Sequence, residues 1–398
     1  MRGHGDDEEE LNDYMELMGH QSYALELPNG TSITLDWLAP ECLPFFVGVN
    51  LWELTGKQEE RVTLSTVLDA VSTVTEPLLE LSCLQSLNDV FDSVGYAASE
   101  GLDGLPSALA SAVTSYLTQA LPTLLGQAER SSEEVRMTTY TEKNAFLTGD
   151  MQYALGKASA RIPGLEYHQI PYIDAWGRKE SSGTPTERSL NNFINPAYTS
   201  NIDESAMEKE LLRLYEVTGE AKVFPDRAAK YFNAEKERID LTADQYVKYA
   251  TVKGQTAYQM MMALTKSGGY RKMSDVKKVE AVSKVYEYAN AIAKTKVSNY
   301  KLDSWVKKAY EVNKRTGVKV DQYISLYLAK LDIDSLKDKD GKTITNSESL
   351  QIMEEVYKVK GLNDEQRQAL FEALGVGKSV RHYNKALVEE KLAQMRKQ

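Results

Sequence analysis

The sequence predicts an all-α fold, in the form of an elongated multi-helix protein with an apolar N-terminal helical section and a C-terminal helical domain. Three observations lead to this prediction. Apolar residues recur at steps of three and four over much of the chain, as they do on one face of a helix. Helix-capping signals bound several of these segments after residue 200. The C-terminal half also lacks the alternating β-branched pattern that is typical of a half-buried strand.

The charge of this 398-residue chain is unevenly distributed. Residues 1–130 carry a net charge of −17 and residues 131–398 one of +6, which gives −11 overall. This acidity argues against a basic nucleic-acid-binding protein, and a mean hydropathy of −0.44 argues against a polytopic membrane protein. Two cysteines, Cys42 and Cys83, are too few for a disulfide scaffold, and the four histidines lie far apart. We therefore expect no metal and no other cofactor.

The first 22 residues are expected to form an acidic, disordered tail. Five consecutive carboxylates at Asp6–Glu10 repel one another and oppose a compact structure. The segment has neither the basic start nor the apolar core of a secretory signal, so no Sec export is indicated. A solvated tail is the favoured interpretation, and an interaction arm is the alternative.

Residues 23–130 are expected to form an apolar helical section that faces a membrane or partner helices. No Lys, Arg or His lies between Arg61 and Arg130. Gly104–Ala128 is uncharged over a length that could span a bilayer, but polar side chains and Pro122 make it a poor transmembrane helix. A buried hairpin or bundle is favoured, and conditional membrane insertion is the alternative. The candidate membrane- or partner-facing residues are Trp37, Phe45, Phe46, Trp52, Leu109, Val113, Leu117 and Leu121.

Residues 131–200 are expected to form a helix and a Pro/Gly-rich junction, and residues 201–398 a helical assembly domain. The composition of residues 181–186 is typical of a flexible linker. The helices of the domain are expected to begin after capping residues, and two of them to end at glycine. They are expected at about 208–218, 243–265, 275–297, 364–374 and 379–395, with Thr242, Ser274, Asn363 and Ser379 at their starts.

Tyrosine is concentrated in the same region, and many tyrosines lie beside a lysine. Of the 23 tyrosines, 19 follow residue 130. Aromatic rings interleaved with cations can bind single-stranded nucleic acid. Acidic residues are nearly as numerous as basic ones here, so we favour a solvated helical surface with tyrosine rings turned into the core. Nucleic-acid contact is a minor alternative.

Two motifs resemble ligand-binding loops without meeting their requirements. Gly375–Ser379 resembles the end of a phosphate-binding loop, but Glu372 replaces its first glycine and a helix is predicted where the motif needs a strand. Asp338–Gly341 resembles a calcium loop, but Leu336 and Ser347 occupy its first and last ligand positions. We interpret the first as the boundary between two helices and the second as a turn. We therefore expect no enzymatic activity and no catalytic residues.

Five phrases of the sequence carry a resemblance to a known family. They are Ile162–Gly164, Pro171–Gly177, Asn192–Pro196, Glu210–Tyr215 and Gly377–Leu387. From about Tyr23 to its end, the chain resembles the C-terminal part of the large polyvalent proteins of Firmicutes phages and prophages. It lacks the long upstream region in which the enzymatic domains of that family lie. It would therefore be either a C-terminal product of a longer protein or a short free-standing version.

The resemblance implies a virion protein, because some members of the family are packaged and ejected with the phage DNA. Our leading hypothesis is a non-enzymatic internal or ejected virion component, located in the virion and, after infection, in the host envelope or cytoplasm. It would assemble as a homo-oligomer and with portal or tail proteins, and would contact the host membrane during DNA delivery. A soluble phage-encoded adaptor that binds a host factor is the alternative.

Overall fold

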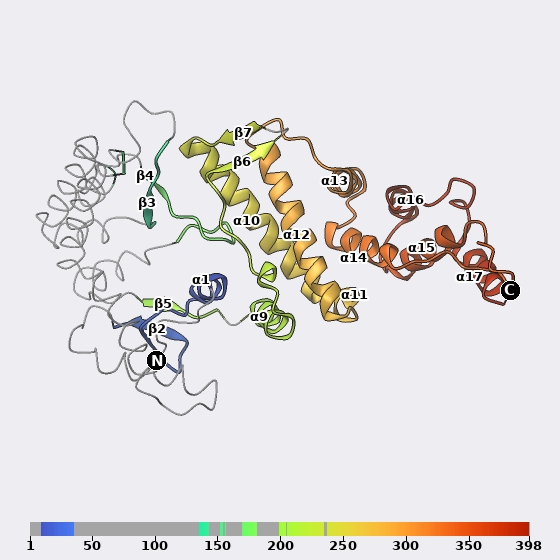
Figure 1. The fold of residues 1–398 in the computed structure, drawn as a ribbon, viewed down its shortest axis with the longest axis horizontal. Coiled ribbons are helices and arrows are strands. Elements are labelled where there is room, and N and C mark those ends of the chain that lie inside the picture. Colours follow the sequence, from blue (N-terminus) through green and yellow to red (C-terminus); the bar gives the residue numbers. More distant parts are fainter. Residues whose placement is uncertain are drawn as a thin grey trace, which may run out of the picture. The chain divides into compact units, whose positions relative to one another are not determined.

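The computed structural model describes the greater part of the C-terminal half and shorter segments before it. The described residues are 9–35, 135–142, 152–153, 156, 169–180, 199–203, 205–234 and 237–397. They are mostly helical, which confirms the predicted helical character (Figure 1). They also contain three small antiparallel sheets, so the prediction of an all-α fold was too narrow for this part of the chain.

The chain divides into two compact units whose boundaries differ from the expected ones. Unit 1 comprises Met1–Glu208 and Asp226–Thr251, and unit 2 comprises Lys209–Pro225 and Val252–Gln398. The segment that follows the expected junction is thus shared between the units. The return of the chain to unit 1 after residue 225 was not predicted.

Helix α1, Glu9–Leu17, lies where the sequence predicted a disordered tail. Tyr14 and Met18 are buried, with exposed fractions of 2% and 3%. Glu10, Asp13 and Glu16 are exposed on the same short segment. Two apolar side chains spaced by four residues are enough to anchor one face of a helix while the carboxylates remain in water. The prediction of disorder was therefore wrong for residues 9–17.

Three short antiparallel sheets belong to unit 1. Their strands are Ala24–Glu26 (β1), Thr31–Thr34 (β2), Met137–Thr139 (β3), Gln169–Pro171 (β4), Thr199–Asn201 (β5), Tyr231–Ala234 (β6) and Glu237–Asp240 (β7). The first sheet has the order β1-β2-β5, and the others are the pairs β3-β4 and β6-β7. Strands of three or four residues are too short to show an alternating pattern, so they could not be recognised in the sequence.

A close approach of two backbones fixes Gly19 beside the first sheet. Gly19 has a φ of +97°, and an added Cβ atom would lie 2.2 Å from the carbonyl oxygen of Asn201. Only glycine fits this position without displacing the end of β5.

Most of the helices in the described part of the chain belong to unit 2 and follow one another along the sequence (Figure 1). They are preceded by α9 and α10, each of which begins in unit 1. The bounds are Ala206–Thr218 (α9), Ala243–Lys266 (α10), Gly268–Arg271 (α11), Asp275–Thr295 (α12), Ser304–Thr316 (α13), Val320–Leu331 (α14), Ser347–Lys358 (α15), Asp364–Ala373 (α16) and Lys385–Met395 (α17). A short 3-10 helix, Ala221–Val223 (η4), follows α9.

The helices of unit 2 share an apolar core. Helix α14 packs on α12, α13 and α15, and α15 packs also on α16 and α17. Fully buried core side chains include Val282, Val285, Ile324, Met353 and Phe371. Burial of a side chain of this size contributes about 1.5–3 kcal/mol, so the shared core accounts for the packing of these helices into one unit.

Two predicted helix starts, after Thr242 and after Asn363, are confirmed, and each is a capping box. At the start of α10, the Gln245 N–H donates to Thr242 Oγ1 at 3.4 Å, and the Thr242 N–H donates to Gln245 Oε1 at 3.0 Å. Asn363 and Gln366 make the same reciprocal pair at the start of α16. Helix α12 begins after Ser274 as predicted, although the Ser274 side chain makes no capping hydrogen bond.

The predicted start of the last helix was wrong. Ser379 lies in a series of turns, and α17 begins at Lys385. Its N-cap is Asn384, whose side chain accepts a hydrogen bond from the Leu387 N–H at 2.9 Å. We had interpreted Gly375–Ser379 as the boundary between two helices. Gly375, with a φ of +81°, does follow the end of α16, but Ser379 does not begin the next helix.

Candidate functional site

The sequence-predicted membrane- or partner-facing residues lie outside the described residues. This applies to Trp37, Phe45, Phe46, Trp52, Leu109, Val113, Leu117 and Leu121, and to Gly104–Ala128. Within the described ranges, no helix is both long and apolar enough to cross a membrane. The same residues bring together no group of three or more His, Cys, Asp or Glu side chains that could hold a metal ion.

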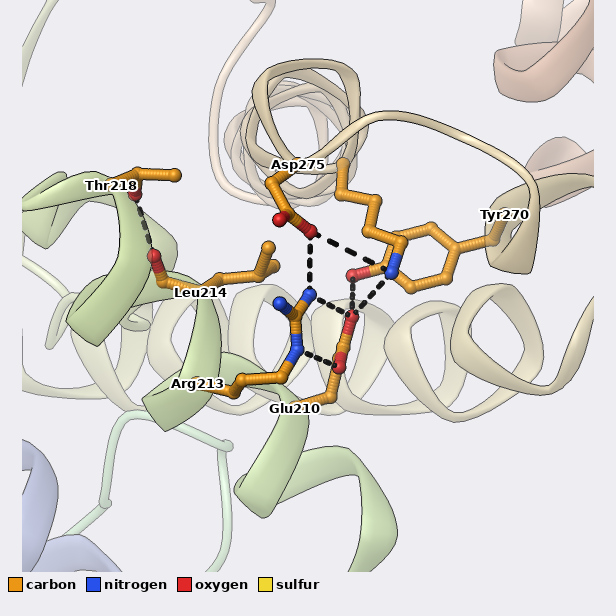
Figure 2. A network of polar contacts seen from close by, with 7 residues as sticks. Glu210, Arg213, Leu214, Thr218, Tyr270 and Asp275 are labelled. Carbon is orange, nitrogen blue, oxygen red and sulfur yellow. Dashed lines mark hydrogen bonds and ion pairs between the residues drawn. The ribbon is translucent and has the colours of Figure 1, made fainter.

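An ionic cluster of unit 2 lies where α9, α11 and α12 meet (Figure 2). Arg213 on α9 donates through Nε to Glu210 Oε2 at 2.8 Å and through Nη2 to Asp275 Oδ1 at 2.7 Å. Lys278 Nζ lies 3.0 Å from Glu210 Oε1 and 3.8 Å from Asp275 Oδ1. Tyr270 on α11 donates its hydroxyl to Glu210 Oε1 at 3.4 Å. We call these five residues the ionic cluster.

The neighbouring charges within the ionic cluster shift the pKa values of its members. Hydrogen bonds from Arg213 hold the pKa of both Glu210 and Asp275 below its usual range. The two carboxylates in turn raise the pKa of Arg213. Burial raises the pKa of the Tyr270 phenol, and the Glu210 charge raises it further. At neutral pH both carboxyl groups of the cluster are therefore ionised and the phenol is neutral.

This arrangement suits the joining of helices more than proton transfer. Both carboxylates contact the guanidinium of Arg213. Its hydrogen bond to Asp275 joins α9 to α12 across 62 positions of the sequence. A general acid or base needs a pKa near the working pH, whereas the shifts in the cluster move the pKa of each carboxylate and of the phenol away from neutrality. Its role in the fold is to fix α9 and α11 against the start of α12.

A second polar centre, in unit 1, is built on Glu208 at the start of α9. The side chain has an exposed fraction of 1%. Tyr14 of α1 donates its hydroxyl to Glu208 Oε2, and the Trp176 indole N–H donates to Oε1 at 3.1 Å. Burial raises the pKa of Glu208, while the hydrogen bonds from Tyr14 and Trp176 and the charge of Arg178 oppose the rise and the charge of Asp203 adds to it. Glu208 is the buried acidic group on which three distant segments of unit 1 converge.

Several lysine and tyrosine side chains contact one another inside the fold. Lys284 on α12 lies over the rings of Trp305 and Tyr327, with Nζ 4.7 Å and 6.0 Å from the ring centroids, and pairs with Glu287 at 2.8 Å. Lys294 lies over the ring of Tyr300 at 4.9 Å. Such cation–π contacts stabilise by about 0.5–2 kcal/mol. These lysines therefore lie against aromatic rings of the protein itself.

The tyrosines themselves are partly core residues, as predicted. The side chains of Tyr249, Tyr270, Tyr288 and Tyr323 are buried. Desolvation raises the pKa of Tyr288 and of Tyr323 to about 12, so both phenols stay protonated at physiological pH.

The Asp338–Gly341 segment is a turn, as the sequence predicted. The Gly341 N–H donates to the Asp338 carbonyl oxygen at 2.9 Å. Asp338 Oδ1 accepts from the N–H groups of Asp340 and Lys342, at 3.0 Å and 2.8 Å. This oxygen therefore serves to close the turn.

Comparison of the chain with models of protein families, with curated proteins and with solved structures gives no match. Neither the ionic cluster nor Glu208 was predicted as a site, although Glu210 and Arg213 lie within the phrase Glu210–Tyr215. The contacts that join the segments run between residues tens to nearly two hundred positions apart. The pairs at i,i+3 spacing, Glu210 with Arg213 and Asp275 with Lys278, are ordinary on a helix surface and mark no site. One signal for Glu208 was present in the sequence: this glutamate lies on the apolar face of the helix predicted near residue 208.

Proposed function

We propose that the chain is a structural protein of a bacteriophage, an internal or ejected virion component that assembles through its C-terminal helices. The observation that carries the proposal is the set of five phrases that resemble the large polyvalent phage proteins. Three of them fall on described elements: Pro171–Gly177 next to β4, Glu210–Tyr215 within α9, and Gly377–Leu387 at the start of α17.

The polar chemistry of unit 2 is consistent with this proposal. The acidic groups of the ionic cluster are neutralised by cations from neighbouring helices, and several lysines contact the protein's own aromatic rings. Side chains used in this way hold helices together. A protein whose task is to assemble needs a stable helical framework of this kind.

The finer features of the proposal concern the N-terminal part of the chain. An apolar helical section was predicted over residues 23–130, but Ala24–Glu26 and Thr31–Thr34 are strands. We therefore assign the section to residues 36–130, where it contacts partner helices or the host membrane during DNA delivery. The very low content of basic residues there would ease passage across a bilayer, because flanking positive charges hold loops on the cytoplasmic side.

Mass spectrometry of purified virions, beside membranes and cytosol of infected cells, tests the proposal. We expect peptides from unit 1 and unit 2 in the virion, and in the envelope fraction after infection. Detection in the cytosol together with absence from purified virions would show that the proposal is wrong and would favour an adaptor that binds a host factor.

A further inference from the structure

An exposed basic corner lies where the chain turns from α10 through α11 into α12 (Figure 1). Residues 266–278 hold five basic side chains and one acidic side chain. Three of the basic residues, Lys266, Arg271 and Lys272, are exposed, and none of these three makes an ion pair with another described residue. We call Lys266, Arg271, Lys272 and the adjacent Val276 the α11 corner.

The remaining charges of this segment are already used within unit 2. Asp275 pairs with Arg213, and Lys278 pairs with Glu210. Lys277 pairs with Asp332, which follows α14. The α11 corner therefore keeps a local excess of positive charge that the unit does not neutralise.

Val276 adds an apolar element to the same place. Its exposed fraction of 76% is the largest among the exposed large hydrophobic side chains of the described residues. An exposed valine close in sequence to three cations that make no ion pair with another described residue offers a partner both apolar area and positive charge. The occupant that fits such a surface is an acidic helix with some apolar side chains.

Helix α1 has these properties. Glu10, Asp13 and Glu16 are exposed and are spaced by three residues, which places them along one side of the helix. Leu11 and Met15 are partly exposed beside them. No basic residue occurs in α1, and the carboxylates of Asp6–Glu8 precede it.

We infer that the α11 corner of one copy of the protein binds the acidic side of α1 of a second copy. The two surfaces differ, so the contact is head-to-tail and each copy keeps one free surface of each kind. Contacts of this type form rings when the rotation closes and extended chains when it does not. The inference holds whether or not the protein is a virion component, because it depends only on the charges of these two surfaces.

Charge-reversal variants of the full chain test this contact. The corner variant is Lys266→Glu/Arg271→Glu/Lys272→Glu, and the α1 variant is Glu10→Lys/Asp13→Lys/Glu16→Lys. The matched control reverses three exposed cations on α13, Lys307→Glu/Lys308→Glu/Lys314→Glu, which make the same change in net charge elsewhere. Sedimentation velocity over a wide range of protein concentration measures the association, and circular dichroism checks that each variant is folded.

We expect the wild type to associate with increasing concentration, and to dissociate when salt is raised to about 1 M, where the Debye length is about 3 Å. Each of the two variants should associate at least about tenfold more weakly than the wild type. An equimolar mixture of the two should recover association, because the acidic corner of one then faces the basic α1 of the other. The α13 control should behave as the wild type.

Two results would overturn the inference. One is unchanged association of the folded corner variant. The other is a wild type that stays monomeric at every concentration. If this monomeric wild type binds vesicles of anionic phospholipid and the corner variant does not, the α11 corner binds a membrane surface instead.

Discussion

The hydroxyl of Tyr14 donates a hydrogen bond to the carboxyl of Glu208, which lies 194 positions further along the chain. Trp176 donates to the other oxygen of the same carboxyl at 3.1 Å. The N-terminal helix, the turn after β4 and the start of α9 therefore meet at one buried acidic group. A buried carboxyl pays a desolvation penalty when it ionises. The stability of unit 1 is consequently linked to the protonation of Glu208.

Replacing Glu208 by glutamine should change the pH dependence of unfolding. Because burial raises the pKa of Glu208 above the ordinary value of 4.5, the folded protein retains a proton that the unfolded chain releases between the two pKa values. This group therefore makes the free energy of unfolding fall as pH rises through that window. In Glu208→Gln this contribution is absent, so the variant should gain stability relative to the wild type as pH rises.

Denaturant-induced unfolding at a series of pH values from about 4 to 8 measures this difference. The matched control is Glu216→Gln, at an exposed position of the same helix. The difference in free energy of unfolding between Glu216→Gln and the wild type should not change across the pH range between the unfolded and folded pKa values of Glu208. Parallel pH profiles of the wild type and Glu208→Gln would contradict the coupling.

The variant Tyr14→Phe tests the hydrogen bond from the other side. It removes a donor that favours the ionised carboxyl, so the pKa of Glu208 should rise further. Loss of one partner in a buried pair lowers the free energy of unfolding by about 1–3 kcal/mol. We expect the free energy of unfolding to fall by this amount at neutral pH, measured by denaturant-induced unfolding. In the Glu208→Gln background the loss should be smaller, as a double-mutant cycle would show.

The control is Tyr231→Phe, at an exposed position. Equal losses from Tyr14→Phe in both backgrounds would contradict the prediction.

Local signals in the sequence were sufficient to predict a helix start where both partners of the capping pair lie within one helical turn. Thr242 with Gln245, and Asn363 with Gln366, are recognisable capping pairs, and both are present in the structure. Asn384 was missed because Ser379 offered a competing start five positions earlier.

Contacts between distant segments could not be predicted in this way. Glu210 meets Lys278 across 68 positions, and nothing in the spacing of either residue indicates the other. The acidic sequence of α1 predicted disorder because its charges repel, but the burial of Tyr14 and Met18 outweighs this repulsion. Tertiary burial therefore decides the features that composition and periodicity left open or misassigned.

Neutralising Glu210 should destabilise unit 2, because the Glu210 carboxylate contacts both Arg213 and Lys278. The Lys278 side chain is largely buried, with an exposed fraction of 13%, and in Glu210→Gln the more distant Asp275 would be its one remaining anionic partner in the ionic cluster. We expect the free energy of unfolding to fall by about 1–3 kcal/mol at neutral pH. The control Glu220→Gln breaks an exposed pair with Lys222 and should lower it by less than about 1 kcal/mol.

The pH dependence of Glu210→Gln should have the opposite sign to that of Glu208→Gln. Because the pKa of Glu210 is lowered by its partners, its stabilising effect is complete above the unfolded value of 4.5 and is lost as pH falls through the folded value. The difference in free energy of unfolding between the wild type and Glu210→Gln should therefore decrease as the pH falls below about 4.5. A gap that stays constant down to acid pH would show that the ionic cluster does not depend on the Glu210 charge.

Replacing Asn384 by alanine should loosen the start of α17. The Asn384 side chain accepts the Leu387 N–H at 2.9 Å, and loss of such an N-cap lowers stability by about 1 kcal/mol. Hydrogen exchange of the first-turn amides of α17 should accelerate in Asn384→Ala, because those N–H groups lose their acceptor. Ser379→Ala is the matched control, since Ser379 is exposed and lies outside the helix. If Ser379→Ala were the more damaging change, the helix would begin where the serine suggests, and the assignment of Asn384 as the cap would be wrong.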